Sequence, residues 1–311
     1  MTYFPQFRHI HCSSRFDRTP EQLETDMDEW RAKAGVITVT EVQNDQAAAT
    51  LSEQGWGYYN SPRDDNSDNC AVLWHMSDWR RIYGAVKQLT NDTYYRLSGQ
   101  KSRPIYCCTV VLRRTDSKYT LLVSVTNLPP NLEGHWQTPD KQWAMRKLAY
   151  LSSLHNWSVY VTYQINKLKP SGALVVADWN LNLKDNWVRD LLINHWGNEW
   201  QLDWVLFPTE GQTLGGEQDV PPGAPGQGKV DRIIDGSLYN GLAVIDGPNL
   251  LAPAGSAIHR PFLEELQFID QADRPIGGEI YGNTQDGEPW WGFGDYMDDE
   301  IYPVTRVFGN D

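Results

Sequence analysis

The chain lacks any apolar run that approaches the ~20 residues a membrane-spanning helix needs. The segment Met1–Asp17 also lacks a basic start followed by an apolar core, which is the pattern of a secretory signal peptide. From these two absences we expect a protein with no signal peptide and no membrane partner.

Cysteines are few, and their pattern suggests no metal site. Cys12, Cys70, Cys107 and Cys108 lack the spacing of metal ligands. Cys107 and Cys108 are neighbours in an apparent strand, so their side chains should point to opposite faces. We therefore expect buried free thiols, and a location in the cytoplasm or another reducing compartment.

Positive charge is also in short supply. The chain has 27 lysines and arginines against 40 aspartates and glutamates, which gives a formal net charge of −13. Such a surface repels polyanions, because non-specific affinity for nucleic acid normally comes from lysine and arginine. The pairs Arg80-Arg81 and Arg113-Arg114 fit either a solvated face or a local basic patch. A nuclease with this composition would need bound cations to offset the repulsion.

The chain does have the material for a large core, since it is 311 residues long and 40% hydrophobic. The motif TPEQ at 19–22 is a capping box with proline, and it predicts a helix that ends near residue 35. Segments 105–113 and 119–127 predict an antiparallel hairpin, and residues 138–169 predict a long helix. Further strands are expected near 36–42, 70–75, 173–178, 230–234, 242–246 and 259–268. This order favours an α/β sandwich of two packed sheets with helices outside.

The segment Gly172–Asn182, with the sequence GALVVADWNLN, contains the first candidate site residues. An apolar run bounded by Gly172 and a polar turn predicts a strand that is covered on both faces. Asp178 and Asn180 follow where this strand ends. A carboxylate supplies an acceptor or a base, and an amide supplies donors and an acceptor, so the two suit a phosphate and an attacking water. The alternative is that both residues only form a turn.

Several other segments accompany this one in a recognisable order. They are VITVTEV at 36–42, CAVLWHMSDWRRI at 70–82, LLVSVTNLPP at 121–130, ADWN at 177–180, KVDRII at 229–234 and SAIHRPFLEEL at 256–266. The series resembles the endonuclease/exonuclease/phosphatase superfamily, which has the deoxyribonuclease I-like fold. The resemblance implies a four-layer α/β sandwich of two packed, mostly antiparallel β-sheets with helices outside. It covers residues 1–268, and residues 269–311 form a separate C-terminal tail.

The resemblance also implies roles for particular residues in metal-dependent hydrolysis of a phosphodiester or phosphomonoester. Glu41 matches the metal-binding glutamate, and the cation would be Mg²⁺ or Mn²⁺. Asp178 and Asn180 match the pair that activates water and holds the phosphate. His259 matches a histidine that contacts the phosphate, and Asp231 matches the acid that orients it. The substrate would be a phosphate ester or a nucleic acid.

Three departures from the family pattern suggest a divergent member. Ile258 stands where the family has an acidic residue, and Asn127 takes the place of the histidine of an H-x-P element. The asparagine expected near the end of the first strand is also missing, and His11 or Cys12 takes its place. His9, His11 and Cys12 therefore raise the alternative of a softer metal such as Zn²⁺, although histidines on such a strand can also be structural.

Residues 277–311 combine aromatic and acidic side chains without periodicity. They fit a tail packed along its own domain, or an arm that docks on a protein partner through aromatic anchors. The alternative to an enzyme is therefore a catalytically silent member of the fold that serves in binding or assembly, with the tail as its docking segment.

Overall fold

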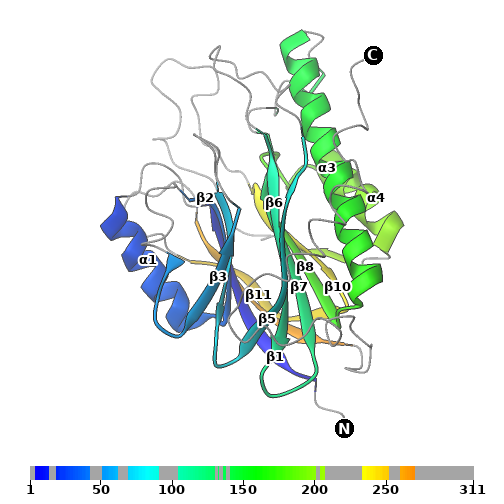
Figure 1. Cartoon of the computed structure of the whole chain (residues 1–311). Coiled ribbons are helices and arrows are strands. Elements are labelled where there is room, and N and C mark those ends of the chain that lie inside the picture. The colour runs from blue at the N-terminus through cyan, green and yellow to red at the C-terminus, as the bar shows by residue number, and fades with distance from the viewer. Residues whose placement is uncertain are drawn as a thin grey trace.

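The computed structural model of the chain describes residues 4–13, 19–42, 51–61, 69–90, 104–129, 132, 136–137, 141–200, 204–206, 233–251 and 260–269. Two six-stranded sheets face each other in this part of the chain, with helices on their outer faces (Figure 1). The predicted four-layer sandwich is therefore confirmed. The predicted tail lies outside the described residues from position 270 onward.

The first sheet has the strand order β11-β12-β1-β2-β4-β3. Its strands are β1 (Gln6–Ser13), β2 (Val36–Val42), β3 (Trp56–Asn60), β4 (Asn69–His75), β11 (Leu242–Leu250) and β12 (Phe262–Phe268). Only β1 and β2 pair in parallel in this sheet. Helix α1 (Pro20–Lys33) connects these two strands and packs on the outer face of the sheet.

The second sheet has the strand order β5-β6-β7-β8-β10-β9. Its strands are β5 (Trp79–Gln88), β6 (Tyr106–Arg114), β7 (Thr120–Asn127), β8 (Gly172–Asp178), β9 (Trp204–Leu206) and β10 (Asp235–Asn240). Only β7 and β8 are parallel, and helix α3 (Lys141–Leu168) connects them. Helix α4 (Asn186–Trp200) packs beside α3 on the outer face (Figure 1). The sheets are thus mostly antiparallel, as predicted.

A local sequence signal accounts for the start of α1, whereas packing accounts for the middle of α3. Thr19 accepts a hydrogen bond from the backbone N–H of Gln22, and the Gln22 side chain accepts one from the backbone N–H of Thr19. This reciprocal capping fixes the start of α1. The β-prone residues in the middle of α3 remain helical because Tyr160 and Val161 are buried against the second sheet, and packing outweighs intrinsic propensity.

The strand predicted near 230–234 is tested only in part. Residues 230–232 lie outside the described chain, and Ile233 and Ile234 precede β10, which begins at Asp235. Asp235 therefore lies at the start of a strand that pairs antiparallel with β8. The strand predicted at 173–178 is confirmed, and every residue of β8 is buried, as expected for a strand covered on both faces.

The space between the sheets changes character along the strands. Its apolar part contains Phe7, Val72, Val123, Leu174 and Phe268, among others. Towards the C-terminal ends of β1 and β2, the same inward-facing positions carry histidine, threonine and serine side chains that are completely buried. Polar groups in such a layer need hydrogen-bond partners, because an unpaired buried polar group costs about 1–3 kcal/mol.

Two further expectations concern cysteine and the membrane. All four cysteines are buried and free, as predicted. Among the helices that the structure describes, none combines the length and the hydropathy needed to cross a bilayer.

Candidate functional site

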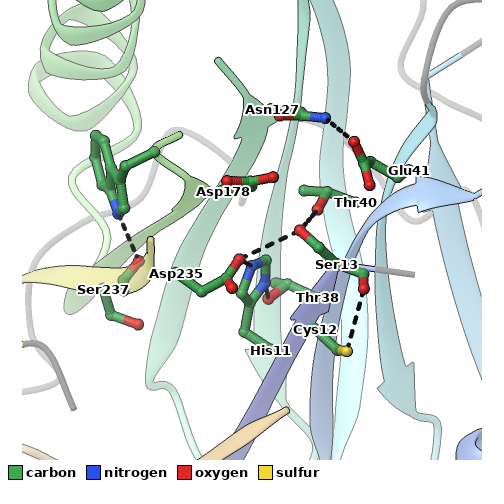
Figure 2. Close-up of polar contacts among 12 residues, drawn as sticks. His11, Cys12, Ser13, Thr38, Thr40, Glu41, Asn127, Asp178, Asp235 and Ser237 are labelled. Carbon is green, nitrogen blue, oxygen red and sulfur yellow. Dashed lines mark hydrogen bonds and ion pairs between the residues drawn. The ribbon is translucent and has the colours of Figure 1, made fainter. Parts of the chain in front are cut away.

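Five strand ends meet at one edge of the sandwich, and we call this edge the mouth. The parallel pairing of β7 with β8 places Asn127 beside Asp178, and the antiparallel pairing of β10 with β8 places Asp235 on the other side of Asp178. Side chains of directly paired residues lie on the same face of a sheet. All three therefore face the first sheet, where the C-terminal ends of β1 and β2 bring Ser13 and Glu41 (Figure 2).

A β-bulge turns Glu41 towards the mouth. Val39 pairs with Ala71 and Val42 pairs with Asn69, so β2 contains one residue more than its partner between these two pairs. Val39 and Val42 both pack on the α1 side of the sheet. Glu41 has a φ of 61°, in the left-handed region, and its carboxylate reaches across to the second sheet. Simple strand alternation would have buried Glu41 against α1.

A chain of hydrogen bonds joins Glu41 to Asp178. The Asn127 amide donates from Nδ2 to Glu41 Oε1 at 3.0 Å (Figure 2). Asn180 donates from Nδ2 to Asn127 Oδ1 and to the backbone oxygen of Leu128, both at 2.8 Å. The Asp178 carboxylate accepts the backbone N–H of Asn180 at 3.0 Å. The structure thus brings together four of the six residues predicted for the site.

The remaining two predicted residues lie outside the part of the chain that the structure describes. These are Asp231 and His259, and Ile258 lies outside it as well. Their roles stay predictions. The described chain resumes at Arg260 and pairs β12 antiparallel with β1, with Phe262 opposite His11.

Two residues at the mouth were missed from the sequence, Ser13 and Asp235. Asp235 is 1% exposed and accepts a hydrogen bond from Ser13 Oγ at 3.2 Å, while His11 Nε2 lies 3.4 Å from the same carboxylate oxygen. Ser13 Oγ is also 2.5 Å from Thr40 Oγ1. The period of two along β1 was the available signal, because it puts residues 9, 11 and 13 on one face and Cys12 on the other.

Burial and charge at the mouth act on a neighbouring tyrosine. Tyr150, on α3, is fully buried and donates its hydroxyl to the backbone oxygen of Trp179 at 2.9 Å. Burial first, and then the nearby charge of Asp178, raises the pKa of Tyr150 well above its ordinary value. The phenol is therefore a neutral hydrogen-bond donor at physiological pH, and it anchors the turn that carries Asp178 and Asn180.

The donors at the mouth fit a hard cation better than a soft one. Glu41 and the two asparagines offer oxygen atoms, which Mg²⁺ and Mn²⁺ prefer, and Mg²⁺ sites commonly use one or two carboxylates with water and substrate phosphate. No group of three or more histidine, cysteine, aspartate or glutamate side chains within the described ranges is arranged to hold a metal. His9, His11 and Cys12 do not form the alternative Zn²⁺ site. The two histidines contact Thr38 and Glu264, and Cys12 packs on the opposite face of the strand, towards α1.

Comparison with solved structures identifies the architecture. An endonuclease/exonuclease/phosphatase family protein from Bacteroides thetaiotaomicron superposes with a TM-score of 0.57 at 10% identity, over 88% of this chain and 100% of that chain. The human Nocturnin catalytic domain with bound sulfate gives 0.56 at 14% identity, over 86% and 96%. This chain has the endonuclease/exonuclease/phosphatase fold. The 2',3'-cyclic phosphatase ANGEL2, in complex with adenosine-2',3'-vanadate, gives 0.54 at 14% identity, over 85% and 96%.

The endonuclease/exonuclease/phosphatase fold is reached here with little sequence in common. No family model matches the chain, and no curated protein matches it either. Because fold alone does not determine function, the case for a reaction rests on the side chains at the mouth.

Proposed function

We propose that this chain is a divergent metal-dependent phosphoesterase that hydrolyses a phosphodiester or a phosphomonoester. The observation that carries the proposal is the β-bulge that turns Glu41 into the mouth, where Asn127 and Asn180 connect it to Asp178. Glu41 and Asn180 both have positive φ values, and strained positions of this kind cluster at functional sites. Neither residue belongs to the hydrophobic clusters that pack the sandwich.

The hydrogen bonds suggest how the roles divide. Glu41 would hold the cation, which supplies charge neutralisation and a polarised water when bound. Asp178 would accept the proton of the attacking water. Both N–H groups of Asn180 Nδ2 already donate within the protein, whereas Asn127 uses one of its two for Glu41. We therefore assign the direct contact with phosphate to Asn127, and to Asn180 the task of holding Asn127.

The residues outside the described chain complete this proposal. His259 would contact the scissile phosphate, and Asp231 would orient that histidine. Asp235, which the structure places beside Asp178, is a second acid available at the mouth. These assignments follow the family pattern and are part of the proposal.

A catalytically silent protein of the same fold is the second candidate. Ile258 occupies the position of a family acid, so Glu41 would have fewer carboxylate partners for a cation, and hard cations are held by carboxylate number and geometry. In that case residues 277–311 would dock on a protein partner.

Hydrolysis by matched variants tests the proposal. The full chain should cleave bis-p-nitrophenyl phosphate or p-nitrophenyl phosphate with Mg²⁺ or Mn²⁺. Asp178→Asn should lower the rate about 10²- to 10⁴-fold, the usual contribution of a general base. Asp190→Asn, at an exposed position of α4 that takes no part in the hydrogen bonds between Glu41 and Asp178, removes the same charge and should keep full activity. A folded wild-type chain that is inactive with every divalent cation would support the silent alternative.

A further inference from the structure

Two buried histidines share one threonine between the sheets. His9 Nε2 lies 2.9 Å from Thr38 Oγ1, and His11 Nδ1 lies 2.8 Å from the same oxygen. All three side chains are completely buried. His9 and His11 come from β1 and Thr38 comes from β2, so two strands of the first sheet build this centre.

Each ring also faces a buried carboxylate through its other nitrogen. His9 Nδ1 is 2.7 Å from Glu264 Oε1, on β12. His11 Nε2 is 3.4 Å from Asp235 Oδ1, on β10 (Figure 2). Glu264, His9, Thr38, His11 and Asp235 thus form one continuous path, which we call the buried relay. It runs from the interior of the sandwich to the mouth.

The buried relay is held at both ends by hydroxyl groups. Ser237 Oγ donates to Glu264 Oε1 at 3.1 Å, and the Tyr239 hydroxyl donates to Glu264 Oε2. Burial raises the pKa of Tyr239 well above its ordinary value, and the charge of Glu264 adds to this, so the phenol remains a donor. At the other end Ser13 donates to Asp235. Two carboxylates without surface exposure are thereby supplied with donors.

The supply of hydrogen atoms sets a minimum number of protons for the buried relay. A hydroxyl has one hydrogen to donate, so Thr38 can donate to at most one of the two rings and must accept from at least one of them. The ring that donates to Thr38 carries a hydrogen on that nitrogen. Its other nitrogen faces a carboxylate, which accepts, so it carries a hydrogen there too. At least one ring is therefore an imidazolium.

The geometry identifies which ring is charged. His9 makes the short contact, and its partner carboxylate on Glu264 also accepts two hydroxyl donors. The contact of His11 with Asp235 is long, and burial lowers the pKa of His11 although the charge of Asp235 opposes that shift. His11 is accordingly neutral, with its hydrogen on Nε2, and accepts the Thr38 hydroxyl on Nδ1.

We propose that His11 is a positioning residue for the reaction at the mouth: an imidazolium on His9, paired with Glu264, fixes the tautomer of His11 through Thr38, and His11 then orients the carboxylate of Asp235 beside Asp178. This proposal rests on the proposed phosphoesterase function for its catalytic consequence. The protonation states follow from the buried relay alone.

Ring-nitrogen spectroscopy tests the protonation states without any assay of activity. In the full chain labelled with ¹⁵N-histidine, at pH 7.5, both nitrogens of His9 should carry hydrogen, while His11 should show hydrogen on Nε2 alone. His9→Gln and His11→Gln variants assign the signals, and half-exposed His75 provides a reference within the same protein. A neutral His9, or a His11 with its hydrogen on Nδ1, would overturn the proposal.

Two substitutions of His11 separate positioning from packing. His11→Gln offers a hydrogen-bond donor towards Asp235, whereas His11→Leu fills the space without a donor. We expect His11→Leu to lower kcat about 10- to 100-fold with little change in KM, as removing a supporting hydrogen bond does at other sites, and His11→Gln to keep most of the activity. His75→Leu should have no effect on kcat.

The outcomes of the two experiments are distinguishable. Equal loss of kcat in His11→Leu and His11→Gln, from chains with the same urea midpoint as wild type, would show that His11 does not act by donating to Asp235. If neither variant folds, the ring-nitrogen signals of the wild-type chain can be assigned by through-bond correlation to the backbone, and the spectrum still decides between the stated protonation states and their opposite. A wild-type chain inactive with every divalent cation would remove the phosphoesterase function and leave the buried relay to be decided by spectroscopy.

Discussion

At the scale of single residues, Glu41 is held in a conformation that most side chains avoid. Its φ of 61° costs a residue with a Cβ roughly 1–2 kcal/mol relative to ordinary backbone. The hydrogen bond from Asn127 to this carboxylate contributes a similar amount in the opposite direction, because bonds to charged groups are worth about 1.5–3 kcal/mol. Stability therefore gives little reason to keep a glutamate here, whereas cation binding does.

The substitution Glu41→Gly distinguishes a role of Glu41 in stability from a role in cation binding. Glycine adopts positive φ without a steric penalty, so the relieved strain should nearly balance the lost hydrogen bond, and the free energy of unfolding should change by less than about 1 kcal/mol. Metal-dependent hydrolysis should fall by about 100-fold or more, since a bound cation supplies several kcal/mol of transition-state stabilisation. Urea unfolding and steady-state kinetics measure the two quantities.

Lys169→Gly is the matched control for that prediction. Lys169 also has a positive φ, 47°, but it is exposed at the end of α3 and has no place in the site. Its replacement should stabilise the chain slightly and leave hydrolysis unchanged. A strongly destabilised Glu41→Gly chain that keeps its activity would show that Glu41 serves the fold.

At the scale of elements, what could be predicted from sequence depends on how local the determining contacts are. Helix α1 was predictable because Thr19 and Gln22 cap it within four residues. The direction of the Glu41 side chain was not predictable from sequence, because the bulge arises from the register of β2 against β4. In the same way, the pairing of β10 with β8 places Asp235 beside Asp178, and no local signal reveals that register.

The contact between α3 and α4 contains a pair of histidines with a consequence for pH. The rings of His155 and His195 lie 5.7 Å apart and nearly perpendicular. Burial, and secondarily the charge of His155, lowers the pKa of His195 from 6.5 to about 4. The unfolded chain therefore binds more protons than the folded chain between these two values, so stability is full above pH 6.5 and is lost as the pH falls towards 4.

His195→Gln should remove this part of the acid sensitivity. We expect the wild-type urea midpoint to fall between pH 7 and pH 4.5, and the variant to lose less over the same interval. His75→Gln, at a half-exposed position, serves as the control and should follow the wild-type profile. Identical profiles for the wild-type chain and His195→Gln would exclude His195 as the source.

At the scale of the whole molecule, the last described strand of the sandwich, β12, ends at Phe268. Strand β12 lies between β1 and β11, and Ile269 donates its backbone N–H to the backbone oxygen of Gly241, which holds the end of the strand in place.

The proposed domain boundary predicts that a chain ending at Ile269 keeps the melting temperature and hydrolysis rate of the full chain. If residues 277–311 dock on a partner, the shortened chain should lose only that assembly, measured by light scattering or pull-down of the identified partner. Unfolding of the shortened chain would contradict the boundary.

The charge distribution favours a small phosphate ester over a long polyanion. Arg80 and Arg113 pair directly in the second sheet, and Arg113 also pairs with Thr120, at the start of the strand that ends at Asn127. Seven residues of strand separate them from the mouth, or about 23 Å at ~3.3 Å per residue, so these cations cannot neutralise a substrate bound there at physiological salt, where the Debye length is about 8 Å. Because the chain has a net charge of −13, its association with plasmid DNA should be slow at low salt and should become faster as NaCl screens the repulsion. Hydrolysis of p-nitrophenyl phosphate should depend much less on salt. Initial rates on both substrates from 20 to about 200 mM NaCl, at fixed Mg²⁺, measure this difference. Faster cleavage of plasmid at the lowest salt would instead indicate a cationic track for nucleic acid leading to the mouth.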